Sequence, residues 1–533
     1  MPAYRWWKVA LAVLAAGAFL AGWMLWKGSA TNGQRPPGRL GGVWVESLAH
    51  APSTLDPARA LGEADVRVAS LVYDGLVRLD PDGRVVPALA RSWRVADGGR
   101  LYVFWLRPGV RFHNGRPLTA DDVVFSLTRL ADPRQPAPRA WVLYGVRGVD
   151  EYLRGRAPAV AGLRAAAPDR VEIRLDFPQP AFLQRLATTG AYVLDRETLT
   201  AGGTFAPVGT GAFRLVAWSA TEVRLAAYRD HYRGRPYLDE VRLVVDGPRP
   251  EVLRAFAGGR RAILRLQPHE VRDLTAGLGW TGPQWQVPLP ATAWIEVNGR
   301  RPPLDRREVR LAVAYAMDRE TLIAGLLPGG YSLAEGLIPP GVAGHGRAGR
   351  VLPPYRALSA REQLVRAGLT GGQSLRWLQP GELLWPSVAA RADHLLGRVG
   401  LELTVETAGH ADYLARTSSS RATYHLAPRS LWAEYLDPEA LFLPLLARPG
   451  APLAVGWVPE AHLRALVSAT GRDRASAAGR LEGELLLTMQ VLPLYHPVTV
   501  LAAQPWVRGL EPTPFPQGPD LWRVSLDPPG DAR

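Results

Sequence analysis

The sequence predicts a large α/β protein with more than one lobe. Its 533 residues exceed what one hydrophobic core usually supports, so two or three lobes are expected. Strand-like and helix-like segments alternate irregularly along the chain, which is typical of mixed α/β lobes. The composition, with 47% apolar and 21% charged residues, is that of an ordinary folded protein and argues against wholesale disorder.

The first thirty residues predict a membrane anchor. Arg5 and Lys8 precede an uncharged run of 18 residues, from Val9 to Trp26. As a helix this run would be roughly 27 Å long, nearly the thickness of a bilayer core. The positive N-terminus favours staying inside, so the rest of the chain would be exported.

Two alternatives remain for this segment. A signal peptide cleaved near Ala30, after the small residues 28–30, is one, and an ordinary buried helix is the other. Residues 20–22 read LAG, as in a lipoprotein box, but Trp23 stands where the lipid-bearing cysteine would be. Residues 31–42 are rich in Gly, Pro and Arg and predict a linker.

The best-defined local elements lie between residues 101 and 130. Residues 101–106 predict a strand, and residues 110–113 predict a second short strand closed by the turn pair Asn114-Gly115. Thr119 predicts a helix N-terminus, with Asp122 three residues on. The apolar face of this helix is expected to consist of Val123, Val124, Leu127 and Leu130.

A similar pattern occurs later in the chain. Asp305 predicts a helix cap, with Glu308 three residues on, and the buried stripe would hold Val309, Ala312, Val313 and Ala316. Further strands are predicted at residues 171–175, 223–228, 241–245 and 401–405. Residues 288–290 and 336–349 predict connections.

Catalytic and cofactor motifs are missing from the sequence. It contains no cysteine, which excludes disulfides, thiolate catalysis and Cys-ligated metals. The glycines of residues 344–349 match GxGxxG, but Pro339-Pro340-Gly341 precedes them where a dinucleotide site needs a strand, which favours a loop. The ten histidines are scattered, without a pair at metal-ligand spacing. We therefore predict no enzyme, no metal and no cofactor.

The net charge of +14 raises the question of nucleic-acid binding. The arginines are spread along the chain and interleaved with acids, and Lys8 and Lys27 are the only lysines. A compositional preference for arginine explains this better than a surface that follows phosphates, so no nucleic-acid partner is predicted. Affinity for an acidic membrane surface stays open.

A long segment carries a family resemblance. Residues 85–95 read VVPALARSWRV, and residues 101–127 read LYVFWLRPGVRFHNGRPLTADDVVFSL. This segment closely resembles the hallmark of the dipeptide/oligopeptide/nickel-binding family of ABC importer receptors, bacterial solute-binding protein family 5. Other matches follow the order of the family: 53–57, 72–76, 207–213, 228–239, Asn298, 303–319 and 491–495. The resemblance covers residues from about 41 to about 512.

The resemblance implies a two-lobed periplasmic-binding-protein clamshell of type II with an extra subdomain, preceded here by the predicted transmembrane helix. The first lobe would comprise residues 43–75, 197–290 and 496–533. The extra subdomain would comprise 76–196 and the second lobe 291–495. Repeated crossings would act as a hinge that closes around a ligand touching both lobes.

The function implied is that of the extracytoplasmic substrate-binding subunit of an ABC importer. It would be a monomer, anchored to the cytoplasmic membrane at the cell surface or in the periplasm, that delivers a peptide-like solute to permease and ATPase subunits. Nickel complexes, haem and oligosaccharides also occur as ligands among the relatives. A membrane-tethered sensor or chaperone with the same clamshell is the alternative.

The resemblance also implies site residues. In peptide-binding members, an acid in a segment resembling Trp-x-Ala-Asp-Tyr-x-Asp-Pro pairs with the peptide α-amine. Residues 431–438 read LWAEYLDP here, which assigns that role to Glu434. A carboxylate facing an ammonium in a desolvated cleft forms a hydrogen bond about twice as strong as a neutral one. Glutamate replaces the family aspartate, and Leu431 stands at the tryptophan position, so the identity of the ligand stays open. The alternative for Glu434 is an acid in a solvated loop without a ligand.

Four more residues are expected around the ligand. Trp432 and Tyr435 would wall the pocket, with plain core packing as the alternative. Leu61 and Gly62 correspond to a family segment whose backbone faces the peptide, in the manner of β-strand addition.

Overall fold

A computed structural model describes residues 38–200, 207–327, 330–349, 351–381, 384–417, 422–447 and 459–527. Residues from Arg39 onward belong to one compact unit. The anchor predicted for residues 1–30 and most of the linker predicted for 31–42 lie outside the described residues. Within the described part, no helix combines the length and the apolar character needed to cross a bilayer.

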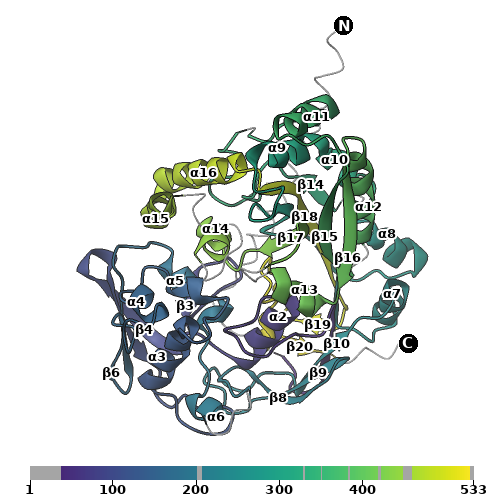
Figure 1. Cartoon of the computed structure of the whole chain (residues 1–533). Helices are drawn as coiled ribbons and strands as arrows, with labels where there is room; N and C mark the ends of the chain where they lie inside the picture. Colours follow the sequence, from purple (N-terminus) through teal and green to yellow (C-terminus); the bar gives the residue numbers. More distant parts are fainter. Residues whose placement is uncertain are drawn as a thin grey trace. The chain divides into compact units, whose positions relative to one another are not determined.

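A mixed sheet of twelve strands, counted over the described residues, organises the fold. We call its two parts the β1 half and the β13 half (Figure 1). The β1 half contains β1 (Val43–Leu48), β8 (Phe213–Trp218), β9 (Glu222–Ala227), β10 (Glu240–Val245), β11 (Ile263–Leu266) and β12 (Gln284–Pro288). The β13 half contains β13 (Ala291–Val297), β14 (Tyr331–Leu333), β15 (Gln373–Pro380), β16 (Leu401–Ala408) and β17 (Leu426–Trp432).

The long strand β18 (Val491–Ala503) joins the two halves. Its residues 491–497 pair with β13 and β14, and its residues 498–503 pair with β11 and β12. The change of partner after Pro497 lies close to the lobe boundary predicted after residue 495. The proline-rich joint predicted at 288–290 connects β12 to β13. The residue ranges of the predicted lobes themselves remain a prediction.

A separate four-stranded antiparallel sheet, in the order β4-β5-β7-β6, lies within residues 76–196. Its strands are β4 (Ala90–Ala96), β5 (Leu101–Leu106), β6 (Leu163–Ala167) and β7 (Arg170–Arg174). Two small ribbons are separate from this sheet. One pairs β2 (Val77–Leu79) with β3 (Val85–Pro87), and the other pairs β19 (Val507–Arg508) with β20 (Ser525–Leu526). The hydrophobic core around this sheet continues into residues 433–491, so the apolar side chains of these two parts of the chain pack together.

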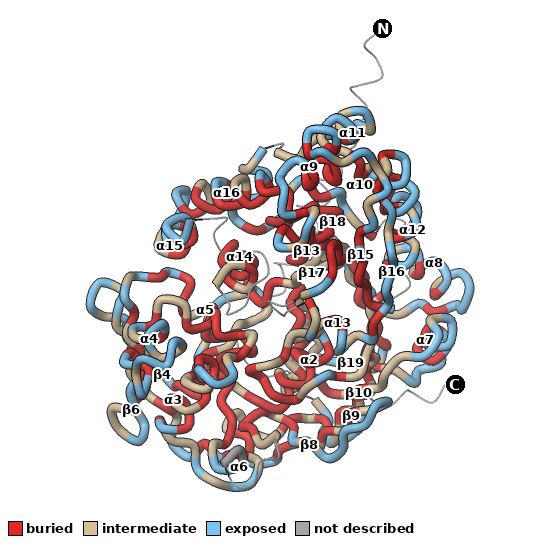
Figure 2. Tube along the Cα trace, viewed as in Figure 1, coloured by how far each residue is buried: buried red, intermediate tan, exposed pale blue. Residues whose placement is uncertain are grey.

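Helices surround the sheets, with buried faces toward the strands and exposed faces outward (Figure 2). Those before residue 300 are α2 (Glu63–Val72), α3 (Ala120–Thr128), α4 (Val149–Leu153), α5 (Phe182–Arg185), α6 (Arg196–Thr200), α7 (Arg249–Ala257) and α8 (Glu270–Arg272). Those after it are α9 (Arg307–Ala316), α10 (Arg319–Ile323), α11 (Ala357–Arg366), α12 (Leu384–Gly397), α13 (His410–Thr417), α14 (Glu439–Leu446), α15 (Glu460–Ser468) and α16 (Gly471–Leu487).

Most of the predicted elements are confirmed. β5 has the predicted bounds, and β7, β9, β10 and β16 lie on the other predicted runs. Helix α3 follows Thr119, whose hydroxyl and backbone N–H both donate to Asp122, each at 2.9 Å. Residues 344–349 form turns, as the loop interpretation requires.

Two local predictions are wrong. Residues 110–113 form no strand, because Phe112 and Arg116 close a tight loop and leave one isolated bridge, between Arg111 and Pro117. Arg306 stands at the N-cap position of helix α9 instead of Asp305, and its side chain makes no capping hydrogen bond. The buried guanidinium of Arg310 donates to the carbonyls of Leu304 and Asp305, both at 2.9 Å, which holds this stretch in a turn before the helix begins. The predicted stripe of α9 is buried as expected.

Candidate ligand cavity

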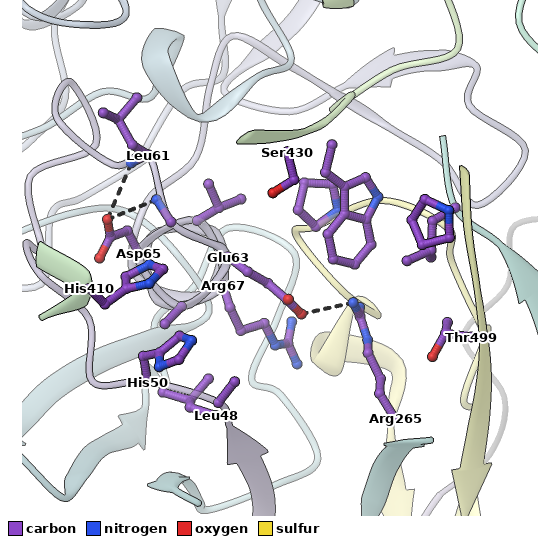
Figure 3. A pocket seen from close by; sticks show the side chains of 18 of the residues that line it. Leu48, His50, Leu61, Glu63, Asp65, Arg67, Arg265, His410, Ser430 and Thr499 are labelled. Carbon is purple, nitrogen blue, oxygen red and sulfur yellow. Dashed lines mark hydrogen bonds and ion pairs between the residues drawn. The ribbon is translucent and has the colours of Figure 1, made fainter. Parts of the chain in front are cut away.

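A cavity of about 580 Å³ lies between the two halves of the sheet. Its lining includes the end of β1, the start of α2 and Arg265 of β11 from the β1 half. On the side of the β13 half, the lining includes Leu431, Trp432 and Glu434. His410 of α13 and Ser430 belong to the same wall (Figure 3). The carboxyl end of β1 faces the cavity, which is where ligands bind in open α/β sheets.

The loop before α2 supplies Leu61 and Gly62 to the lining. The backbone N–H of Leu61 donates to Oδ2 of Asp65 at 3.2 Å (Figure 3). The N–H of Gly62 donates to the same oxygen at 3.1 Å, and the carbonyl of Gly62 accepts from Val66 at 3.0 Å. These bonds cap the helix, so the loop is fixed by the chain itself. The carbonyl of Leu61 is the backbone group of this pair that the helix cap does not use.

Trp432 lines the cavity from the end of β17. Its indole Nε1 donates to the carbonyl of Pro514 at 2.6 Å. The guanidinium of Arg265 lies over the indole ring. Arg265 also donates to Glu63 at 2.8 Å (Figure 3). Side chains from both halves therefore meet at this wall.

Glu434 is buried at the cavity wall, which rules out a solvated loop acid. Its Oε1 accepts from the guanidinium of Arg139, a residue that is itself 4% exposed. Its Oε2 accepts from the backbone N–H and hydroxyl of Thr189, at 2.9 and 2.8 Å, and from the amide of Gln517 at 3.0 Å. The carboxylate thus has a cationic partner within the chain.

Tyr435 is fully buried and does not belong to the cavity lining. Its hydroxyl donates to Glu439 at 3.1 Å, and Glu439 accepts from Arg474 at 3.0 Å. Arg474 also binds both oxygens of Asp437, at 2.6 and 2.7 Å. The segment 435–439 is therefore held by a buried ionic network, which favours the core-packing alternative for this aromatic.

A second contact crosses the cavity near Gly62. The rings of His50 and His410 stack with centroids 4.2 Å apart and an interplanar angle of 15° (Figure 3). His50 follows β1 and His410 begins α13, so the stack joins the two halves.

Sequence reasoning missed the residues that act as partners. Arg139, Arg265, His410 and Gln517 carry no motif, and each meets its partner across more than eighty residues of chain. Among the described residues, no three histidine or acidic side chains are grouped so as to hold a metal ion.

Comparisons with known proteins agree with this architecture. Residues 84–451 match the model of bacterial extracellular solute-binding proteins, family 5 (middle). A "Probable di/tripeptide-binding protein 5" of Pseudomonas aeruginosa is 27% identical over 488 residues, covering 86% of this chain and 90% of the relative. The Haemophilus influenzae OppA complex with the peptide RPPGFSPFR superposes with a TM-score of 0.81 at 20% identity, covering 92% of this chain and 100% of that one. Helicobacter pylori DppA, described as ABC transporter-associated and in complex with the peptide STSA, gives a TM-score of 0.78 at 20% identity, covering 92% and 99%. The predicted two-lobed α/β fold is confirmed by these structures.

Proposed function

This chain belongs to the bacterial extracellular solute-binding proteins of family 5, and from that premise we propose that it captures a peptide-like solute for an ABC importer. It would bind the solute outside the cytoplasm and present it to the permease and ATPase subunits. It would act as a monomer and perform no chemistry on the solute. A tether formed by the helix predicted in residues 1–30 would keep it at the membrane.

The observation that carries this proposal is the cavity bounded by both halves of the sheet. Its volume of about 580 Å³ lies within the range of about 300–1,000 Å³ found for small-ligand sites. A solute that touches both halves favours the closed arrangement, since it gains contacts in that state alone. The two related structures described above carry peptides, which supports a peptide-like ligand over a nickel complex, haem or an oligosaccharide.

We propose roles for the predicted residues on this basis. Leu61 would contact the solute through its side chain and carbonyl, while Gly62 keeps the loop close to it. Trp432 would pack against the solute as a flat apolar wall. Glu434 would stand at the end of the site together with Arg139. Tyr435 would act as a positioning residue through Glu439.

A thermal-shift screen of the full-length protein tests the solute class. Tri-alanine, a nickel chelate, haem and maltotriose would each be added over a range of concentrations. A ligand present at 100 times its Kd stabilises the folded state by about 2.7 kcal/mol, so binding is readily detected. We expect stabilisation by tri-alanine alone. Stabilisation by another of these ligands, with none by tri-alanine, would refute the peptide assignment.

A further inference from the structure

Four of the acidic side chains that line the cavity are paired with arginines of the chain itself. Glu46 accepts from Arg67 at 2.7 Å, Glu63 from Arg265 at 2.8 Å, and Glu270 from Arg249 at 2.6 Å. Glu434 completes this series with Arg139. At these four positions, a solute with a cationic end therefore meets a carboxylate whose charge is already compensated.

Of these four ion pairs, Glu434 with Arg139 is the most deeply buried. The two side chains are 7% and 5% exposed. Arg139 also donates through Nε to the carbonyl of Ala60, next to the loop that lines the cavity. A guanidinium held by two acceptors and buried from water cannot be displaced without leaving a desolvated cation behind, which is costly.

The second carboxylate oxygen of Glu434 is also occupied. Oε2 takes three donors, two from Thr189 and one from Gln517. A carboxylate has about four lone-pair sites in total, and the described contacts supply four donors, one on Oε1 and three on Oε2. An incoming ammonium would have to share Oε1 with the guanidinium of Arg139 or displace one of these donors.

We infer that Arg139 is a specificity-determining residue, which fills with its own guanidinium the place where Glu434 would otherwise hold a ligand ammonium. The inference rests on the proposed binding of peptide-like solutes. The chain then does not select for a free amino terminus at Glu434. Peptides with a blocked amino terminus, and other peptide-like solutes with a neutral end, bind with about the same affinity as peptides with a free amino terminus.

One other carboxylate of the lining could receive an ammonium. Oδ1 of Asp246, just after β10, is buried and has no hydrogen-bond partner among the described residues. Its Oδ2 lies 3.8 Å from Arg249, beyond hydrogen-bonding distance. Asp246 thus provides a rival position for the amino end, and its variant belongs in the test.

The experiment compares tri-alanine with N-acetyl-tri-alanine by isothermal titration calorimetry at pH 7, using the full-length protein. The variants are Arg139→Met, Glu434→Gln, Arg139→Met with Glu434→Gln, and Asp246→Asn. Arg139→Met keeps most of the side-chain bulk and leaves Glu434 available. The double variant removes both charges, so it is the matched control for loss of the ion pair. Circular dichroism of each variant verifies folding.

We expect the wild-type protein to bind the two peptides with Kd values within about threefold of each other. Arg139→Met should prefer the free amine by roughly ten- to a hundredfold, the usual effect of a charge-assisted hydrogen bond. The double variant should lose that preference. If Arg139→Met does not fold, the wild-type ratio and the Glu434→Gln ratio still decide, because both should be near one.

Three outcomes overturn the inference. A wild-type preference for the free amine that Glu434→Gln abolishes shows that Glu434 holds the ammonium despite Arg139. A preference that Asp246→Asn abolishes places the amino end at Asp246 and shows that the chain does select for it. A folded Arg139→Met without a new preference also contradicts the inference. In all three cases peptide binding, and with it the proposed function, would stand, whereas binding of neither peptide by any protein would reject both.

Discussion

The guanidinium of Arg265 lies over the indole of Trp432, with its carbon 4.6 Å from the ring centroid. Arg265 belongs to β11 of the β1 half, and Trp432 ends β17 of the β13 half. The contact thus joins the two sides of the cavity at a wall where a solute would pack. Cation–π contacts of this kind contribute about 0.5–2 kcal/mol, depending on how far they are removed from water.

Trp432→Ala is expected to weaken tri-alanine binding by about tenfold, or ~1.4 kcal/mol. The reason is the loss of both an apolar wall and the contact with Arg265. Calorimetric titration gives the Kd values. Trp218→Ala on β8 is the control, because Trp218 is 47% exposed and lies outside the cavity lining. Equal losses in both variants would contradict the role of Trp432.

Glu439→Ala is expected to destabilise the fold by about 3–5 kcal/mol. Glu439 is fully buried, binds Arg474 at 3.0 Å and lies 3.8 Å from Arg185, so its removal leaves buried cations uncompensated. Urea unfolding followed by circular dichroism measures the change. The control is Glu406, an exposed residue that pairs with Arg416. Glu406→Ala should lower the free energy of unfolding by no more than about 1 kcal/mol. A similar effect of both substitutions would speak against the buried network.

Glu482→Gln should change the pH dependence of stability. Burial raises the pKa of Glu482 to about 7, although the N–H groups of Ile338 and Leu337 donate to it. The folded state therefore binds more protons than the unfolded state between about pH 4.5 and pH 7, and this group lowers stability as pH rises through that window. The full effect is about 3 kcal/mol. In urea titrations, we expect the variant to be more stable than wild type at pH 7.5 and equally stable at pH 4.5. The control is Glu402→Gln, which should show no gain at either pH because Glu402 is exposed.

His496 should act in the opposite direction. It lies on β18, and burial lowers its pKa to about 4. The unfolded state then binds more protons between about pH 6.5 and pH 4, so this group reduces stability as pH falls through that window. His496→Gln should lose less stability than wild type between pH 7 and pH 4.5. The control is His394→Gln, because His394 is exposed. If His496→Gln loses as much stability between pH 7 and pH 4.5 as wild type and His394→Gln do, this expectation is refuted.

Local signals explain what could be predicted from the sequence. The capping pair of Thr119 and Asp122 and the strand at 101–106 depend on neighbours only a few residues away, and both are confirmed. Asp305 does not cap helix α9, because Arg310 binds the carbonyls of Leu304 and Asp305 and holds them in a turn before the helix. Capping rules do not include such an interaction. The family resemblance predicted the fold, and Glu434 and Trp432, the residues it assigns to the ligand, line the cavity. Their contact with a ligand stays a prediction.

The partners of the predicted site residues could not be found in this way. Arg139 and Glu434 are 295 residues apart, and Trp432 and Pro514 are 82 apart. No spacing rule covers contacts at such distances in a single sequence, because they depend on how separate elements pack. For the same reason, the motif does not distinguish a core residue from a pocket residue at Tyr435, whose burial depends on the bond to Glu439.

The shared strand β18 has a consequence for how this protein melts. Its backbone supplies ladder bonds to β13 on one side of Pro497 and to β11 on the other, so neither part of the sheet can unravel without exposing the strand that the other part needs. Thermal denaturation should accordingly be a single cooperative event for both parts. Amide protons along residues 491–503 should exchange with deuterium at the rate of global opening, among the slowest in the chain.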